Sequence, residues 1–314
     1  MAHRGFRPGH EPKLRDKKLN EMGLIGLKHP AEYIPFFPEY EDEFQLRKRQ
    51  LRPLWEGKNF DGRLNLERDL LKLKGLRKAC DCTAFAFQLD YTSRRGLDTL
   101  ERLTKYTDKM TNEEKEKHIL DLYNVTVDAT NEIDLFNEGC TCTKRDNAPP
   151  IRQRPRPEGR YALGFTPQKG TEKYADMLLD ELNVFERDYP DVMECYSKDE
   201  VVFQNFLAMP LIKRQIEDKI QECDARAALR LIVGAHDRNL EVITAIGLSK
   251  KLDQKDIGKL DDFQHAWMGA IIKEFADFDT YCTCKPKIKE QINETKNIRE
   301  LSDNWKRRTL YRSM

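Results

Sequence analysis

The sequence predicts an all-α protein made of two related, long antiparallel helical hairpins, with an extended N-terminal arm before them. Apolar residues recur every three or four positions over most of the chain, which is the spacing of a helix that buries one face. No segment alternates apolar and polar residues with the period of two that a half-buried strand would show. The third observation is a set of cysteine motifs that occurs in the same order in two parts of the chain.

The composition limits the classes of function. The 314 residues suffice for one large or two modest domains, and 35% are charged, with 55 basic against 54 acidic side chains. General nucleic-acid binders normally have a basic excess, so we expect no specific nucleic-acid partner. No apolar run approaches the roughly 18 residues that span a bilayer, and no apolar core of a secretory signal follows the basic residues 1–18. We therefore expect neither a transmembrane segment nor secretion.

Residues 1–40 are predicted to form an extended arm. They are rich in proline and contain the segment "AEYIPFFPEY", in which prolines alternate with aromatic side chains and disfavour a helix. Aromatic side chains are costly to leave in water. The arm is therefore expected to lie along a partner protein or over the chain's own helices.

The first helical hairpin module is expected over residues 41–145, with one long helix at about 83–106. The segment "TNEE" then forms a capping box, in which Thr111 caps the next helix and Glu114 returns a hydrogen bond. That helix is expected to end at Gly139, since glycine is typical of helix C-termini. Its predicted buried stripe consists of Ile119, Tyr123, Ala129, Ile133 and Phe136.

A linker rich in proline and arginine is predicted at residues 146–170. The second helical hairpin module is expected over residues 171–287, and Asp253 is predicted to cap its last long helix, at about 254–280. Residues 288–314 are expected to form a C-terminal helix and basic tail. Further helices are predicted at about 171–188, 199–222 and 224–250.

The cysteine motifs mark corresponding points of the two modules. A shift of 143 positions places "CDCTA" at Cys80 on "CDARA" at Cys223, and a shift of 142 places "GCTCTK" on "YCTCKP". Each module then consists of a helix that ends at "CD", a long helix, a turn, and a second long helix that ends at "CTC". We interpret the modules as copies produced by internal duplication, at about residues 63–145 and 206–287.

Antiparallel packing would gather the cysteines at the open end of each hairpin. The first cluster is expected to contain Cys80, Cys82, Cys140 and Cys142. The second is expected to contain Cys223, Cys282 and Cys284, with Cys195 as the fourth thiol because position 225 is alanine. All eight are disulfide candidates, and each bond would stabilise the fold by about 2–4 kcal/mol.

Two other chemistries remain open for these cysteines. A zinc site with four cysteine ligands would use the same clusters, although Cys-x-Cys is a less usual half-site than Cys-x-x-Cys. Reduced, buried thiols are the ordinary state in a cytosolic protein. We expect neither a metal site nor a cofactor. The alternative is zinc at the cysteine clusters.

No catalytic motif is found in the sequence. It contains no GxxxxGK[ST] phosphate loop and no GxGxxG motif, and the His236–Asp237 pair lacks a second histidine some tens of residues upstream. We therefore expect no catalytic residues and no enzymatic activity. The chain is predicted to be a structural subunit of a large eukaryotic assembly, bound to other protein subunits through its N-terminal arm and basic C-terminal tail.

The cysteines decide the expected location. Disulfide-clamped helical hairpins occur in small proteins of the mitochondrial intermembrane space, which favours that side of the inner membrane, in a respiratory-chain complex or ATP synthase. The alternative is a structural protein of the ciliary axoneme or of microtubules, in which the thiols stay reduced. A zinc-binding interaction module or an enzyme is a third possibility.

Overall fold

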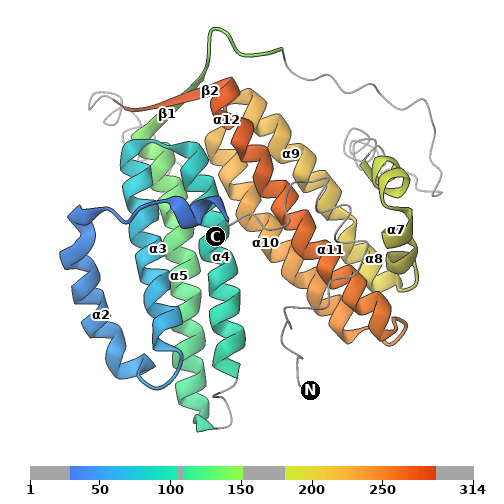
Figure 1. Ribbon diagram of the computed structural model, residues 1–314, viewed down its shortest axis with the longest axis horizontal. Coiled ribbons are helices and arrows are strands. Elements are labelled where there is room, and N and C mark those ends of the chain that lie inside the picture. The colour runs from blue at the N-terminus through green and yellow to red at the C-terminus, as the bar shows by residue number, and fades with distance from the viewer. Residues whose placement is uncertain (1–28, 105, 107–108, 151–180, 288–314) are drawn as a thin grey trace, which may run out of the picture. The chain divides into compact units, whose positions relative to one another are not determined.

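The computed structural model describes residues 29–104, 106, 109–150 and 181–287. These residues are almost entirely helical, and their only sheet has two strands, which confirms the predicted all-α class (Figure 1). Most of the predicted arm, the linker and the C-terminal helix and tail fall at residues 1–28, 151–180 and 288–314, outside the described residues. The domain boundaries given above stay a prediction.

The chain divides into two compact units. We call residues 30–148, 223–230 and 278–287 the disulfide unit, because every disulfide found among the described residues lies within it. Most of the described remainder, residues 181–222 and 231–277, belongs to the other unit, which we call the aromatic unit after the ring cluster in its core.

The disulfide unit contains two short 3-10 helices, most of the long helices and both strands. Their bounds are η1 Pro30–Tyr33, η2 Pro38–Tyr40, α2 Glu41–Trp55, α3 Phe60–Ala79, α4 Cys82–Thr104, α5 Asn112–Gly139, β1 Cys140–Lys144, α12 Phe278–Tyr281 and β2 Cys282–Pro286. Helix α10, Ala225–Leu248, begins in this unit and continues into the aromatic unit. The remaining elements of the aromatic unit are α7 Pro190–Ser197, α8 Glu200–Phe206, α9 Ala208–Glu222, α11 Gln254–Lys273 and η4 Glu274–Asp277.

Helix α3 lies at the centre of the disulfide unit and contacts α2, α4 and α5 (Figure 1). Its leucines are buried around much of its circumference, as expected for a helix with neighbours on several sides. The rings of Phe85 on α4 and Phe136 on α5 lie 5.2 Å apart, centroid to centroid, and join those two helices. The core of this unit is therefore built around α3.

The described end of the arm, residues 30–40, packs on the unit's own helices. Phe36 and Phe37 pack against a buried cluster that includes Tyr40 and Phe44. The ring of Phe37 lies so close to α3 that a Cβ added at Gly75 would be 2.3 Å from it. A glycine at this position is what allows the aromatic ring to reach the helix backbone.

Helix α5 confirms its predicted start and corrects part of its predicted stripe. The capping box of Thr111 and Glu114 is present, and the helix ends at Gly139. Ile119 and Tyr123, however, were predicted to be buried and are 56% and 62% exposed. The buried positions are His118, Leu122, Val125, Ala129, Ile133 and Phe136. The first half of α5 carries apolar residues on two faces, so the spacing of apolar residues did not identify the buried one.

The two Cys-Thr-Cys segments correct the expectation that the chain contains no strand. Each forms a five-residue strand, and β1 pairs with β2 in antiparallel register. Gly139 has no positive φ, so α5 continues directly into extended chain instead of ending in a left-handed glycine turn. Two predicted helices are also divided: 199–222 into α8 and α9, and 254–280 into α11, η4 and α12.

The aromatic unit has its own core. The ring of Phe185 lies 4.7 Å from that of Phe206 on α8 and 5.5 Å from that of Trp267 on α11. Asp253 caps α11 as predicted, since its side chain accepts hydrogen bonds from two backbone N–H groups of the first turn. The cap and the ring cluster together fix α11 in this unit.

Candidate functional site

Three disulfides converge on the β1–β2 ribbon, which lies at one end of the helices of the disulfide unit (Figure 1). They are Cys80–Cys140, Cys142–Cys284 and Cys223–Cys282. The first and third are alike, since each joins the residue after a helix to the first residue of a strand. They span 60 and 59 residues, and their four cysteines are at most 8% exposed. Both therefore anchor a strand of the ribbon in the core.

Cys80 and Cys223 share one backbone conformation. Their φ angles are 55° and 60°, in the left-handed region that costs a residue other than glycine about 1–2 kcal/mol. The next residues, Asp81 and Asp224, each accept a hydrogen bond from the backbone N–H three positions on, at 2.9 and 3.0 Å. In both places Cys-Asp ends one helix and caps the next, and the disulfide holds the cysteine in its strained turn.

Cys142–Cys284 lies at the centre of the ribbon. In the antiparallel register Cys142 faces Cys284, while Cys140 faces Pro286 and Lys144 faces Cys282. The pairing is therefore symmetric about this disulfide. A local twofold axis there relates residues that are 142 positions apart, which is the separation of the two bonded cysteines.

Hydrogen bonds at the ends of the ribbon follow the same symmetry. The backbone N–H of Arg145 donates to the carbonyl of Tyr281 at 2.9 Å, and that of Lys287 donates to the carbonyl of Gly139 at 2.8 Å. The two donors are 142 residues apart, and so are the two acceptors. The two Cys-Thr-Cys segments thus have equivalent backbone surroundings.

The structure corrects the expected four-cysteine clusters. The first cluster was to include Cys82 and Cys142, but Cys142 pairs with Cys284 from the other Cys-Thr-Cys segment, and Cys82 is a free thiol. Cys82 is the first residue of α4, where its side chain is 2% exposed. Burial raises its pKa well above the ordinary value for a thiol, so it stays protonated and unreactive.

Cys195 is the second correction. It was expected to complete the other cluster with Cys223, but it lies on α7 in the aromatic unit and is also a free thiol. Its Sγ is 3.3 Å from Oδ1 of Asp256 and 3.2 Å from the carbonyl of Asp191, so it donates to oxygen. Burial is the main cause that raises its pKa, and the contact with Asp256 adds to it.

No metal-binding cluster of three or more His, Cys, Asp or Glu side chains is found within the described ranges. The six cysteines of the ribbon region have their sulfurs in disulfides, and a disulfide sulfur is not a thiolate ligand. Over the same described ranges, no helix has the length and apolar content needed to span a bilayer.

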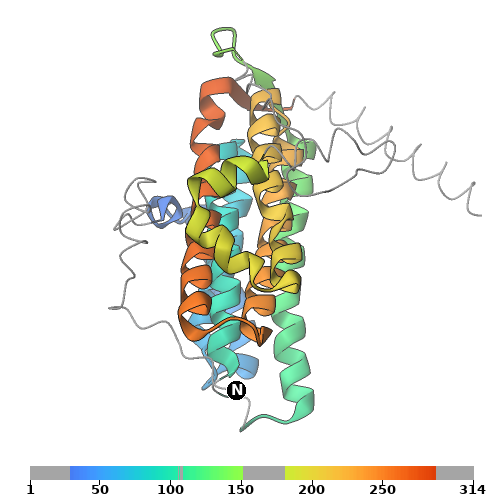
Figure 2. The same ribbon diagram turned by 90° about the vertical axis from the view of Figure 1, so that its right-hand side faces the viewer.

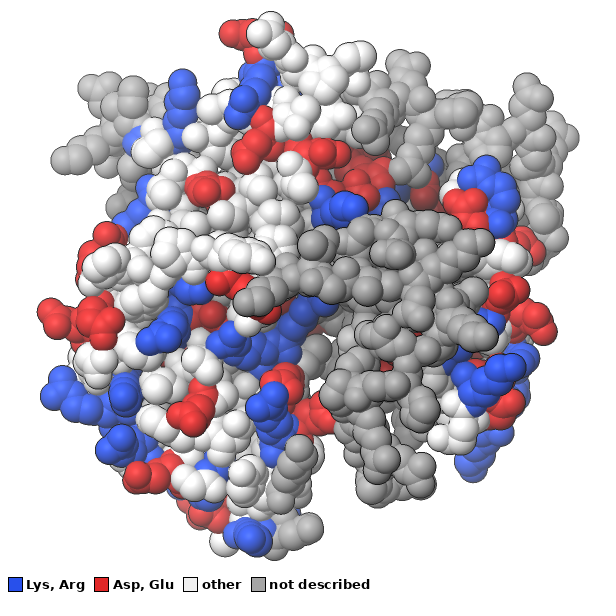
Figure 3. Space-filling model, in the orientation of Figure 1, with Lys and Arg blue, Asp and Glu red and all other residues white. Residues whose placement is uncertain are grey.

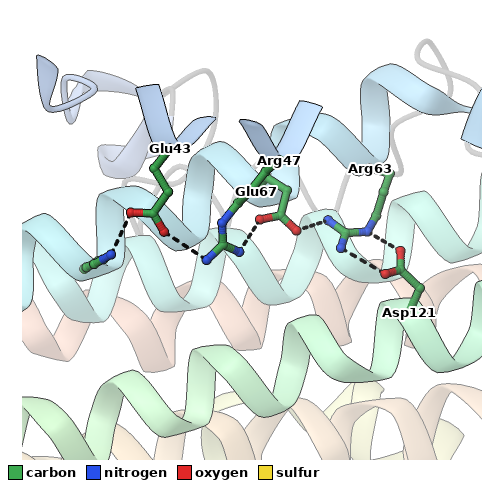
Figure 4. Close-up of polar contacts among 6 residues, drawn as sticks. Glu43, Arg47, Arg63, Glu67 and Asp121 are labelled. Atoms are coloured by element: carbon green, nitrogen blue, oxygen red, sulfur yellow. Dashed lines mark hydrogen bonds and ion pairs between the residues drawn. The ribbon is translucent and has the colours of Figure 1, made fainter. Parts of the chain in front are cut away.

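A chain of ion pairs crosses the disulfide unit beneath α2, and sequence reasoning did not identify it (Figure 4). Arg47 on α2 and Arg63 on α3 both contact the carboxylate of Glu67, at 2.6 and 2.7 Å. Arg63 also contacts Asp121 on α5 at 2.6 Å, and Arg47 contacts Glu43 at 3.1 Å. Only the pairs four residues apart within one helix could be inferred from the sequence. The pairs between helices fix α2 and α5 against α3.

The same corner contains a buried histidine. The indole N–H of Trp55 donates to Oδ2 of Asp121 at 2.8 Å, and the Trp55 ring lies 4.4 Å from that of His118, centroid to centroid. His118 is fully buried, and among the described residues neither ring nitrogen has a hydrogen-bond partner. Burial lowers its pKa, so the imidazole is neutral and acts as an apolar ring.

Asp69 is a buried carboxyl between α3 and α4. It is 2% exposed, and burial raises its pKa to about 6 against the opposing effect of Arg95, whose Nε lies 3.2 Å from Oδ2. On the face shown in Figure 3, acidic and basic side chains of the described residues are interspersed, in agreement with the balanced composition.

The features that distinguish this chain are therefore the twofold ribbon and its disulfides. Compared with protein-family models, curated proteins and solved structures, the chain gives no match.

Proposed function

We propose that this chain is a non-catalytic structural subunit of a large eukaryotic assembly, shaped by disulfides. The observation that supports this most is the convergence of three disulfides on one short ribbon. Each such bond restricts the unfolded chain and stabilises the fold by about 2–4 kcal/mol. A protein in which covalent bonds secure helix ends suits a load-bearing or spacing role.

The chain is further proposed to consist of two related hairpin modules that arose by internal duplication. The support is the set of paired features at Cys80 and Cys223: the same left-handed turn, the same aspartate cap, and disulfides over 60 and 59 residues. The twofold register of β1 and β2 adds to it, because the axis relates residues 142 apart. In this proposal the ribbon joins the two copies, and Cys142–Cys284 is their covalent link.

The proposed location is the intermembrane-space side of the mitochondrial inner membrane, as an accessory subunit of a respiratory-chain complex or ATP synthase. Disulfides persist in oxidising compartments, and the intermembrane space is one in which helical hairpins are clamped in this way. Contacts with neighbouring subunits are assigned to the N-terminal arm and the basic C-terminal tail. The axonemal alternative requires reduced cysteines.

The test is to trap the redox state in cells of the source organism. Alkylation of the denatured protein without reductant is expected to label two cysteines, and alkylation after reduction to label all eight. Labelling of all eight without reductant would contradict the disulfide-based placement and favour the axonemal alternative.

Fractionation tests the location separately. The protein is expected to resist added protease in intact mitochondria and to be digested once the outer membrane is opened. Recovery with axonemes, or digestion in intact mitochondria, would contradict the intermembrane-space placement.

A further inference from the structure

The three disulfides of the ribbon region differ in their access to solvent. We call Cys142–Cys284 the central disulfide, and Cys80–Cys140 and Cys223–Cys282 the flanking disulfides. The four flanking cysteines are at most 8% exposed, whereas both cysteines of the central disulfide are partly exposed. In Figure 2, strand β1 lies beyond the upper end of α5, past the helices of the disulfide unit. A thiol in solution therefore has its most direct access to the central disulfide.

The flanking disulfides are also held against backbone carbonyl oxygens. Sγ of Cys140 lies 3.3 Å from the carbonyl oxygen of Arg77. Sγ of Cys223 lies 3.6 Å from that of Tyr281. A thiolate formed by cleavage of such a bond would face an oxygen of partial negative charge in a buried site, which opposes cleavage. Among the described residues, neither cysteine of the central disulfide has such a contact.

The two strands carry positive charge and contain no carboxylate. Lys285 directly follows Cys284, Lys144 lies two positions after Cys142, and both lysines are exposed. A cationic side chain near a disulfide attracts an incoming thiolate and stabilises the one that leaves. The charges of the strands therefore assist thiol exchange at the central disulfide.

We propose that the central disulfide is a thiol–disulfide exchange site, which a dithiol reduces while the flanking disulfides stay intact. One thiolate of the dithiol attacks Sγ of Cys142 or Cys284, and the other cysteine leaves as a thiolate and takes a proton from water. The second thiolate of the dithiol then attacks its partner sulfur in the mixed disulfide and displaces the bonded cysteine, which is protonated in turn. Two electrons and two protons pass to the two cysteines, and the dithiol becomes a disulfide.

The two free thiols of the chain are not suited to this exchange. Cys82 is 2% exposed, and burial raises its pKa well above the ordinary value. Cys195 lies in the aromatic unit, and burial raises its pKa as well. A thiol that stays protonated is a poor nucleophile. The reductant therefore has to come from solution.

Reduction at this site would release one specific cross-link. The central disulfide joins the segment of α2 to α5 to the segment that begins at Cys223, whereas each flanking disulfide lies within one segment. After reduction each strand would stay anchored to its own helix, but β1 and β2 would no longer be bonded covalently to each other. Because a two-stranded pair is marginally stable in water, the ribbon should open more easily. This role does not depend on the assembly or compartment proposed above.

Reduction of the folded, oxidised chain in buffers of reduced and oxidised dithiothreitol tests the order of cleavage. Acid quenching, alkylation in denaturant and peptide mass spectrometry locate each thiol. The expected result is a plateau of four thiols, which are the two free ones plus Cys142 and Cys284. The plateau should begin at a ratio of reduced to oxidised dithiothreitol at least about tenfold below the ratio that opens the flanking disulfides.

The matched control combines Cys142→Ser with Cys284→Ser and should stay at two thiols over the range of the plateau. Circular dichroism confirms that this variant folds, and the order of cleavage in the wild type decides the test if it does not. Cleavage of a flanking disulfide before the central one, or together with it, would overturn the proposal.

Hydrogen–deuterium exchange tests the structural consequence. At the plateau, the backbone amides of residues 140–145 and 282–287 should exchange at least about tenfold faster than in the oxidised chain, because the ribbon opens locally. The amides of α3, in the core of the same unit, should exchange at an unchanged rate. Ribbon amides that exchange equally fast before and after reduction would also overturn the proposal.

Discussion

Cys142 on β1 is bonded to Cys284 on β2, and the two residues occupy equivalent places in the two Cys-Thr-Cys segments. The bond therefore does not close a hairpin. It joins the segment that contains α2 to α5 to the segment that begins at Cys223, whereas each of the other two disulfides lies within one of those segments. This central bond is the covalent link on which the proposed two-module organisation depends.

Removal of the central bond should destabilise the protein measurably. Cys142→Ser combined with Cys284→Ser is expected to lower the free energy of unfolding by about 2–4 kcal/mol, because the unfolded chain is released from a long closed loop. Guanidinium unfolding followed by circular dichroism measures the change. Cys82→Ala, at a buried thiol outside any disulfide, is the control and should cost about 1 kcal/mol or less. A loss of about 1 kcal/mol or less in the Cys142→Ser, Cys284→Ser variant, no more than in the control, would contradict a stabilising role for the central bond.

Asp69→Asn should change how stability depends on pH. The folded carboxyl has a pKa of about 6 against an ordinary value of 3.8, so the folded state binds the proton more tightly. The contribution of this carboxyl to the free energy of unfolding is complete below about pH 4 and is lost as the pH rises through 6. The stability of the wild type relative to the variant should thus fall by about 3 kcal/mol between pH 4 and 7, at about 1.4 kcal/mol per unit. Urea unfolding measures both free energies. If the values for the wild type and the variant changed by the same amount between pH 4 and 7, the raised pKa of Asp69 would be contradicted.

Glu67→Gln should disrupt the ion pairs beneath α2. The substitution leaves Arg63, which is 3% exposed, with one carboxylate instead of two, and it also removes a partner of Arg47. Loss of a partner from a buried pair costs about 3 kcal/mol or more. The control is Glu113→Gln, which removes an exposed pair with Lys117 and should leave the thermal midpoint unchanged. Equal midpoints for the two variants would contradict a structural role for Glu67.

Local signals made much of the helical fold predictable. The capping box at Thr111 and the cap at Asp253 were identified correctly because each depends on side chains within one turn. Antiparallel packing of the helices predicted that cysteines gather at the hairpin ends. It did not predict which cysteine bonds to Cys142, because a thiol at a hairpin end has neighbours from its own hairpin and from the other segment. A five-residue strand with only three alternating positions gave too little pattern to reveal the β1–β2 pairing.

The exposed side of α5 was missed for a related reason. Ile119 and Tyr123 have helical spacing, but so do the residues that are actually buried one position away. Periodicity identifies that a helix is amphipathic, and only the neighbouring helices decide which of two apolar faces they cover. The ion pairs between α2, α3 and α5 were likewise hidden, because they connect positions distant in sequence.

Disulfide mapping of the unreduced protein tests the central claim most directly. Cleavage before Asp81 separates Cys80 from Cys82, and electron-transfer fragmentation of the linked peptides distinguishes Cys140 from Cys142 and Cys282 from Cys284. The expected result is three linkages, Cys80–Cys140, Cys142–Cys284 and Cys223–Cys282, with Cys82 and Cys195 as free thiols. A linkage of Cys142 to Cys82, or a chain without disulfides, would contradict it.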